Sequence, residues 1–274
     1  MKNKKQRNRL KKTLGQHLLV KKLYLDRIIS AAKLDHKSRV LEIGAGPGNL
    51  TSKLCENSGQ VIAVELDKKF IPELEELKIN CENLQVIHAD ILDLDLLQLL
   101  PLPPDWKVVA NPPYQIMTEI ILKLLKTGKS RFTDLFLTVQ KEVGERLCAE
   151  KGNKKYGAIT IYTYYNTIPE MMFKIPGTAF KPVPKVDSCL VHLKIRKEHP
   201  FPIESDRFFR FVQNCFSQRR KNLVNAVKHA WREISPGDLR KYLPEWGFDP
   251  KKRPENLSPE EFEKLFRFLS ETRR

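Results

Sequence analysis

The sequence has 274 residues, of which 41% are hydrophobic, so it can form a substantial buried core in about two domains. Its net charge of +16 favours a polyanionic partner, with nucleic acid preferred over an anionic membrane surface. No apolar run reaches the ~18 residues of a membrane span, and the basic N-terminus lacks the apolar region of a signal peptide. We therefore predict a cytoplasmic protein with no membrane partner.

Cysteine and histidine show no metal-binding spacing. The cysteines lie far apart, at Cys55, Cys81, Cys148, Cys189 and Cys215, with no Cys-x-x-Cys pair. The histidines form no His-Glu-x-x-His or comparable motif. We therefore predict no metal site, and free thiols in a reducing compartment.

The first twelve residues carry seven Lys or Arg and no acid. Such a run is typical of a disordered tail, and it is equally suited to an arm that contacts phosphates. The two interpretations are compatible, so both stay open.

The central part of the chain alternates apolar runs with helical patterns. A first helix is predicted over 24–32, where Leu25, Ile28 and Ile29 share a face. This alternation predicts an α/β fold, with a mostly parallel sheet and helices on both faces. The predicted strands are 39–43, 61–65, 85–89, 107–110 and 135–140, and the helical stretches include 68–79 and 115–127.

The pattern changes after about residue 144. A helix and a strand are predicted within 158–175, and prolines fix a loop over 180–185. A last strand over 189–195 is expected to pair antiparallel at the edge of the sheet, before a linker at 199–202. Helices are then predicted over 205–217, 219–232, 236–243 and 259–270, the last two beginning with Ser-Pro caps.

Glycines at alternate positions follow the first predicted strand. Without Cβ atoms, Gly44, Gly46 and Gly48 would let a ligand's sugar or phosphate lie against bare backbone. The spacing is neither that of a dinucleotide fold nor that of a phosphate-binding loop. A tight strand-to-helix turn with no ligand remains the alternative.

Polar residues end four of the predicted strands, and they are Gly44, Glu65, Asp90 and Asn111. Because ligands of parallel sheets bind at the carboxyl ends of the strands, this rim predicts a binding site, although one acid there would only suggest a helix cap. Glu65 is placed to accept hydrogen bonds from two ribose hydroxyls. Asp90 can accept from the exocyclic amine of an adenine, so an adenosine ligand fits.

The segment Asn111-Pro112-Pro113-Tyr114 is the sharpest local signal. The amine of a nucleobase is a poor nucleophile, because its lone pair is delocalised into the ring. The side-chain oxygen of Asn111 and the carbonyl of Pro112 can each accept one of its N–H bonds, while Tyr114 stacks on the extruded base. The alternative is a proline-stiffened loop without a catalytic role.

Together these motifs resemble the S-adenosylmethionine-dependent adenine-N6 methyltransferases. The resemblance is closest to the ribosomal RNA small-subunit adenine-N6 dimethyltransferase family (KsgA/RsmA), and it covers nearly the whole chain. The motifs that carry it are Glu42-Ile43-Gly44-Ala45-Gly46-Pro47-Gly48-Asn49-Leu50, Glu65, Asp90, Asn111-Pro112-Pro113-Tyr114 and the segments 14–19, 180–188 and 218–223.

The resemblance implies a role for each motif residue. Asn111, Pro112 and Tyr114 would be catalytic, and Phe180 a second aromatic wall for the target base; from the residues alone Phe180 would be core. One departure is Pro112, where the family more often has Leu, but its contact is through backbone. The implied S-adenosylmethionine site comprises His17, Leu19, Gly44, Gly46, Glu65, Asp90 and Asn111.

The expected domains are a basic arm over 1–12, a Rossmann-like methyltransferase domain over 13–198 and a helical domain over 199–274, for which the resemblance implies RNA recognition. Arg219, Arg220 and Lys221 are expected to open an RNA-binding helix in the last of these. A solvated charged face is the alternative.

The implied function is dimethylation of two adjacent adenosines near the 3′ end of small-subunit (16S) ribosomal RNA. The enzyme is expected to act as a monomer on an immature 30S-type particle. Two alternatives stay open: a large-subunit adenine-N6 methyltransferase of the macrolide-resistance type, and a non-catalytic RNA-binding assembly factor. A DNA methyltransferase is disfavoured, because no separate target-recognition domain of the usual size remains.

Overall fold

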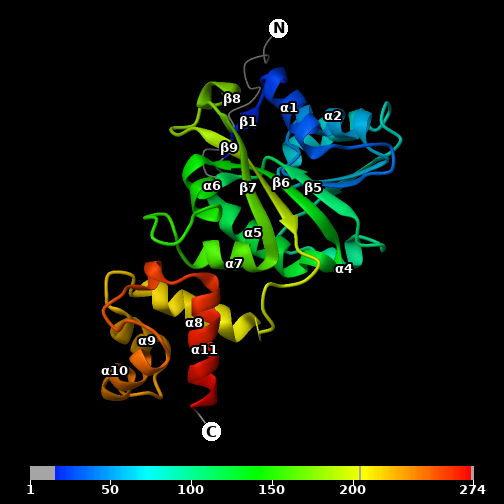
Figure 1. Cartoon of the computed structure of the whole chain (residues 1–274). Helices are drawn as coiled ribbons and strands as arrows, with labels where there is room; N and C mark the ends of the chain where they lie inside the picture. The colour runs from blue at the N-terminus through cyan, green and yellow to red at the C-terminus, as the bar shows by residue number, and fades with distance from the viewer. Residues whose placement is uncertain (1–15, 204, 273–274) are drawn as a thin grey trace. The chain divides into compact units, whose positions relative to one another are not determined.

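The structure, a computed structural model, describes residues 16–203 and 205–272 and divides into two compact units (Figure 1). The first unit contains the chain up to Gly144 and Ile168–Ile195, and the second contains Glu145–Thr167 and the chain from Arg196 onward. The predicted boundary at 198 lies three residues beyond the observed one at Ile195, and the prediction also missed an excursion of the chain into the second unit, 145–167. This excursion joins the second unit because Tyr156 and Ile161 are buried in its aromatic core.

A seven-stranded sheet forms the centre of the first unit, in the order β4-β3-β2-β5-β6-β9-β7. Strands β2 to β6 pair in parallel, as predicted, whereas β9 pairs antiparallel with β6. The strands are β2 (Arg39–Ile43), β3 (Gln60–Glu65), β4 (Leu84–His88), β5 (Trp106–Ala110), β6 (Phe132–Gln140), β7 (Thr167–Ile175) and β9 (Ser188–Ile195).

The expectation that the last strand lies at the edge of the sheet is wrong. Strand β9 is bordered on its far side by β7, which takes the edge position. The residues of β9 are correspondingly buried along most of its length, from Ser188 to Leu193.

Helices cover both faces of this sheet. On one face α1 (Lys22–Ala32), α2 (Asn49–Asn57) and α3 (Ile71–Leu77) share a core with alternate strand residues such as Val40 and Ala63. Helices α4 (Leu96–Leu99) and α5 (Met117–Thr127) lie on the opposite face (Figure 1). The remaining helix, α6 (Lys141–Leu147), follows β6, and short 3-10 turns at Lys68–Phe70 and Tyr114–Ile116 precede α3 and α5.

A two-stranded antiparallel ribbon joins the N-terminal segment to a distant part of the chain. Strand β1 (Leu18–Leu19) pairs with β8 (Phe180–Lys181), with Leu19 opposite Phe180. The loop predicted over 180–185 therefore begins as a strand. This pairing brings the motif at 14–19, of which 16–19 is described, next to the motif at 180–188.

The second unit is helical and packs around aromatic side chains. Phe208, Phe211, Phe262 and Phe266 are buried in it, and the predicted cap at Ser258 is confirmed, since its hydroxyl accepts from the backbone N–H of Glu261. The helices are α7 (Ala158–Asn166), α8 (Ser205–Ser217), α9 (Leu223–Ala230), α10 (Pro236–Glu245) and α11 (Pro259–Glu271).

The prediction that Arg219 opens a helix is wrong. Helix α9 begins at Leu223, because the Asn222 side chain caps it by accepting from the backbone N–H of Asn225. Arg219, Arg220 and Lys221 lie in the preceding turn.

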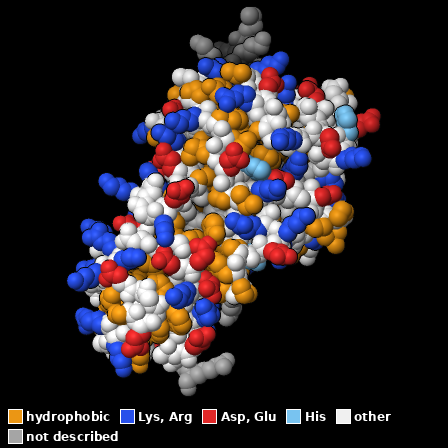
Figure 2. Space-filling model, viewed as in Figure 1, with side chains coloured by type: hydrophobic (Ala, Val, Ile, Leu, Met, Phe, Trp, Pro, Cys, Tyr) orange, Lys and Arg blue, Asp and Glu red, His pale blue; other side chains and the backbone are white. Residues whose placement is uncertain are grey.

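Basic side chains are spread over the visible face of the protein, with acidic ones between them (Figure 2). Within residues 16–203 and 205–272, no helix has both the length and the apolar character needed to cross a bilayer. The same residues contain no group of three or more His, Cys, Asp or Glu side chains that could hold a metal ion.

Candidate active site

The strand ends bring the predicted rim residues together. Gly44, Glu65 and Asp90 line one hollow of about 390 Å³, and Gly44, Glu65 and Asn111 also line an adjoining one of about 310 Å³. The four residues therefore border one continuous region at the carboxyl ends of β2, β3, β4 and β5. This placement is the one that the alternation of strands and helices predicts.

The glycine loop depends on backbone conformations that other residues rarely adopt. Gly44 has φ of 73° and Gly46 has φ of 57°. A Cβ atom on Gly46 would lie 2.9 Å from Cδ2 of Leu18, so that side chain would have to shift; the positive φ is the stronger reason for glycine here. The loop therefore presents bare backbone to the hollow beside it.

Glu65 is held in place from two sides. One carboxylate oxygen accepts from the backbone N–H of Gly46 at 2.8 Å, and the other accepts from that of Asp67 at 2.7 Å. The side chain is buried, and burial raises the pKa of Glu65, while these backbone donors act in the opposite direction. Each oxygen keeps a free lone pair, so the carboxylate can accept from two further hydroxyl groups.

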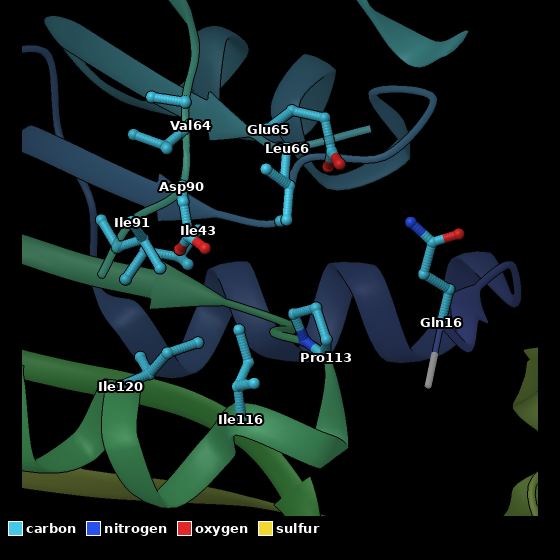
Figure 3. A pocket seen from close by; sticks show the side chains of 12 residues that line it. Gln16, Ile43, Val64, Glu65, Leu66, Asp90, Ile91, Pro113, Ile116 and Ile120 are labelled. Carbon is cyan, nitrogen blue, oxygen red and sulfur yellow. The ribbon is translucent and has the colours of Figure 1, made fainter. Parts of the chain in front are cut away.

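The hollow beside Asp90 has apolar walls. Figure 3 shows the Glu65 carboxylate and the Gln16 amide on one side and Asp90 with Ile91 on the other. One Asp90 oxygen accepts from the backbone N–H of Leu92 at 2.9 Å, which fixes the carboxylate. A flat apolar ring that carries an amine matches this combination of walls and acceptor. The other lining residues are Ile43, Gly44, Val64, Leu66, Ala89, Pro113, Ile116 and Ile120.

The side chain of Asn111 has a defined orientation. Its Nδ2 donates to the main-chain carbonyl of His17 at 2.9 Å. A carbonyl can only accept, so the amide cannot be flipped. Its Oδ1 is buried and has no hydrogen-bond partner among the described residues. A buried acceptor without a donor is unfavourable, so the site is prepared to receive one.

Tyr114 is held by three neighbours. Its ring stacks on His17 with centroids 5.4 Å apart, meets the ring of Phe180 edge-on at 6.5 Å, and its hydroxyl lies 2.6 Å from Oγ of Ser188. Burial raises the pKa of Tyr114 to about 12, so the phenol keeps its proton at neutral pH.

The other residues of the predicted site lie around this centre. His17 and Pro112 line the hollow beside Asn111, whereas Leu19 is 4% exposed and lines a neighbouring hollow behind the glycine loop. Phe180 is 1% exposed and belongs to the core of the first unit. The structure thus places Phe180 beside Tyr114 with no open ring face.

Two polar residues here were assigned no role from the sequence. Glu42 is buried in β2 with Oε2 lacking a partner among the described residues, and burial raises its pKa to about 8. An acid within the apolar run Val40-Leu41-Glu42-Ile43 was the available signal. Ser188 ends the 180–188 motif, but its contact with Tyr114 could not be predicted, because it joins residues 74 positions apart.

The basic residues predicted to bind RNA lie in the second unit. Arg219 forms an ion pair with Glu255 and donates to the carbonyl of Asn153 at 3.3 Å. Arg220 and Lys221 are exposed. The predicted arm over 1–12 lies outside the described residues.

Comparison with known proteins gives consistent matches over nearly the whole length. A family model described as ribosomal RNA adenine dimethylase matches residues 7–271. Proteins named ribosomal RNA small subunit methyltransferase A are 37% identical in Staphylococcus carnosus, covering 94% of this chain and 90% of the relative, and 39% identical in Clostridium botulinum, covering 93% and 92%.

Solved structures are also similar to this chain. A dimethyladenosine transferase from Plasmodium falciparum has a TM-score of 0.78 and 28% identity, and the match covers 93% of this chain and 98% of that one. A 23S rRNA methyltransferase, ErmE, has a TM-score of 0.69 and 26% identity, with 92% and 99% covered.

Proposed function

Because the chain belongs to the ribosomal RNA adenine dimethylase family, we propose that it methylates adenine N6 twice on each of two adjacent adenosines near the 3′ end of small-subunit ribosomal RNA. The methyl donor is S-adenosylmethionine. The observation that carries the proposal is the buried, unpartnered Oδ1 of Asn111, which needs a donor such as an amine N–H.

The residues at the strand ends suit the donor molecule. Glu65 offers two fixed carboxylate oxygens for ribose hydroxyls, and Asp90 offers an acceptor at the rim of an apolar hollow for the adenine amine. Gly44 and Gly46 carry no side chain that would fill the hollow between Glu65 and Asn111. His17 and Leu19, from the N-terminal segment, lie at the border of the same region. The unpartnered oxygen of Glu42 lies next to this region.

When bound, S-adenosylmethionine supplies an electrophilic methyl group on a sulfonium. The protein prepares the nucleophile for it. Asn111 Oδ1 and the Pro112 carbonyl accept from the two N–H bonds of the target amine, which raises electron density on nitrogen and orients its lone pair. The nitrogen would thereby be aimed for direct in-line attack on that methyl group, with the S–CH3 bond breaking and S-adenosylhomocysteine leaving, and the proton that the amine loses would pass to solvent.

The aromatic residues hold the target base. Tyr114 is half-buried and His17 covers one face of its ring, so the base would stack on the other face. Phe180 is 1% exposed, so its part as a second wall requires its surroundings to shift when the base enters. The first methyl group stays on the nitrogen in the second round, so the pocket must also admit the monomethylated amine.

The proposal also covers the oligomeric state, the cellular compartment and the particle that carries the substrate RNA. The enzyme acts as a monomer in the cytoplasm, on small subunits that are still being assembled. Arg220 and Lys221 contribute phosphate contacts from the second unit, which serves in RNA recognition.

One rival function has a specific observation in its favour. The similarity to ErmE extends over 92% of this chain, and that protein is named a 23S rRNA methyltransferase. The small-subunit assignment is preferred, because the relatives with 37% and 39% identity carry the small-subunit name.

The test is incubation of the enzyme and labelled cofactor with unmethylated small subunits, followed by mass analysis of nucleosides. We expect N6,N6-dimethyladenosine from two adjacent positions near the 3′ end, located by primer extension. Transfer to large-subunit RNA would support the rival. Binding of small subunits without any transfer would indicate an assembly factor.

The first testable prediction is that Asn111→Ala abolishes transfer while the protein stays folded. The substitution removes the oxygen that accepts from the amine, and Asn111 lies in a loop at the rim rather than in the core. Calorimetry and thermal melting check cofactor binding and folding separately. An Asn111→Ala enzyme with full activity would remove this mechanism.

A further inference from the structure

Residues 181–187, the last residue of β8 and the loop after it, have an unusual surface for a segment beside an active site. The loop connects β8 to β9 and exposes two apolar side chains, Val183 at 62% and Val186 at 47%. Lys181 and Lys185 are exposed beside them. Single exposed apolar residues are ordinary, so exposure alone does not indicate a binding surface. A binding surface is indicated here by how the loop is held and by its position beside Tyr114.

The loop is held at both ends. Its Pro182 carbonyl lies 2.7 Å from Nδ1 of His17, so the ring nitrogen donates to it. At the other end, the Asp187 side chain accepts from the backbone N–H of Gly177 at 2.9 Å, and its carbonyl accepts from that of Lys141 at 2.9 Å. A loop held in this way can bind a partner at a small cost in ordering.

Both ends of the loop touch the residue that holds the target base. The ring of Phe180, just before the loop, meets Tyr114 at 6.5 Å, and the hydroxyl of Ser188, just after it, lies 2.6 Å from the Tyr114 hydroxyl. Val183 is three residues from Phe180 along the chain, about 10 Å at most, so an RNA strand that delivers a base to Tyr114 comes within reach of this loop.

Extruding a base uncovers the faces of the bases beside it. An apolar side chain can cover such a face, as wedge residues do in bent nucleic acids, while lysines neutralise the adjoining phosphates. We infer that residues 181–187 form an RNA wedge: Val183 packs on a base next to the target adenosine, and Lys181 and Lys185 contact flanking phosphates. This inference deepens the proposed function and rests on it.

The test compares Val183→Ser with the parent enzyme and with a matched control. The control is Ile79→Ser, which removes an apolar side chain that is 79% exposed and precedes β4, at the opposite edge of the sheet. Binding is measured to unmethylated small subunits and to protein-free ribosomal RNA extracted from them, and cofactor binding by calorimetry. Both variants change exposed side chains, so both should fold.

We expect Val183→Ser to weaken binding to both RNA forms by up to about tenfold, with cofactor affinity unchanged, because the transfer free energy of one valine has that size. Ile79→Ser should bind as the parent does. The double variant Lys181→Ala/Lys185→Ala should lower the dependence of log affinity on log salt by about 0.7 for each phosphate that is no longer neutralised.

Three outcomes would overturn the inference. They are unchanged RNA binding by Val183→Ser, an equal loss in Ile79→Ser, and a loss seen with intact subunits but not with protein-free RNA, which would indicate a protein contact. A parent enzyme that transfers no methyl group would defeat the proposed function instead. In that case a weakened Val183→Ser would still show that RNA contacts this loop, whereas the base beside the target adenosine would fall with the proposed function.

Discussion

At the scale of single residues, the site is defined by acceptors whose orientation is fixed by main-chain groups. The carbonyl of His17 determines which way the Asn111 amide faces, and backbone N–H groups hold the Glu65 carboxylate. The sequence predicts the identity of both residues from their places at strand ends. It cannot predict the orientation of Asn111, because His17 is 94 positions away.

The contact between Tyr114 and Ser188 leads to a second prediction. Ser188 is fully buried at the start of β9, so its hydroxyl sets the position of the Tyr114 ring. Ser188→Ala and Tyr114→Phe should each lower kcat by up to about tenfold, since one hydrogen bond contributes about 0.5–1.5 kcal/mol. Cofactor affinity should not change.

The double variant decides whether the two residues act together. If the bond is what matters, Ser188→Ala/Tyr114→Phe should be no slower than either single variant. Thr138→Val is the matched control, because Thr138 is also fully buried in the sheet and its hydroxyl lacks a partner among the described residues. Losses that add in the double variant would show that Ser188 does not act through Tyr114.

The third prediction concerns Glu42, whose pKa burial raises to about 8. The folded state then binds more protons than the unfolded state between about pH 4.5 and 8. This contribution to stability is complete below about pH 4.5 and is lost as pH rises toward 8, with a slope of up to about 1.4 kcal/mol per pH unit.

Glu42→Gln should remove most of this slope, because the amide does not ionise. Unfolding by denaturant at several pH values measures it. Burial raises the pKa of Glu65 in the same direction, so a residual slope of the same sign is expected. A slope identical to that of the parent protein would contradict the assignment to Glu42.

At the scale of elements, the sequence predicts the strands that a local hydrophobic pattern determines. It does not predict strands that form only by pairing with a distant part of the chain. The strands β2, β3 and β5 are predicted to within one residue, because each is a buried apolar run between turn signals. The short ribbon of β1 and β8 is missed, since two residues on each side carry no periodicity.

The predicted start of α9 is wrong for a different reason. Arg219, Arg220 and Lys221 have good helix propensity, but the cap at Asn222 begins the helix after them. The turn ties Arg219 to Glu255 and leaves Arg220 and Lys221 exposed. Three neighbouring cations therefore have two different roles.

This difference leads to the fourth prediction. Arg220→Ala/Lys221→Ala should weaken binding to ribosomal RNA and reduce its salt dependence, with no change in melting temperature. Arg219→Ala should instead lower the melting temperature by a few degrees, since the half-buried Glu255 loses its partner. Equal effects of the two variants on melting would contradict this division.

At the scale of the whole molecule, the excursion at 145–167 sets the composition of the two units. Tyr156 is 2% exposed in the second unit, and its hydroxyl donates to the carbonyl of Leu257 at 2.9 Å. The pattern over 158–175 predicts a helix and a strand correctly but places both in one domain, because helix patterns do not reveal which core a helix joins.

The fifth prediction follows from this composition. A fragment of residues 199–274 lacks Tyr156, Ile161 and Tyr165 from its core, so it should not unfold cooperatively. Circular dichroism on heating measures this. Mixing the fragment with one of residues 1–198 should restore cooperative melting, and an independently stable 199–274 would refute the role given to the excursion.

The same excursion constrains the order in which the nascent chain can acquire its structure. Translation delivers 145–167 before β9 has emerged and well before α8 to α11. The buried side chains of α7 therefore cannot reach their final core before the last third of the polypeptide has been made. The folding of α7 into its core is therefore coupled to completion of the C-terminal helices.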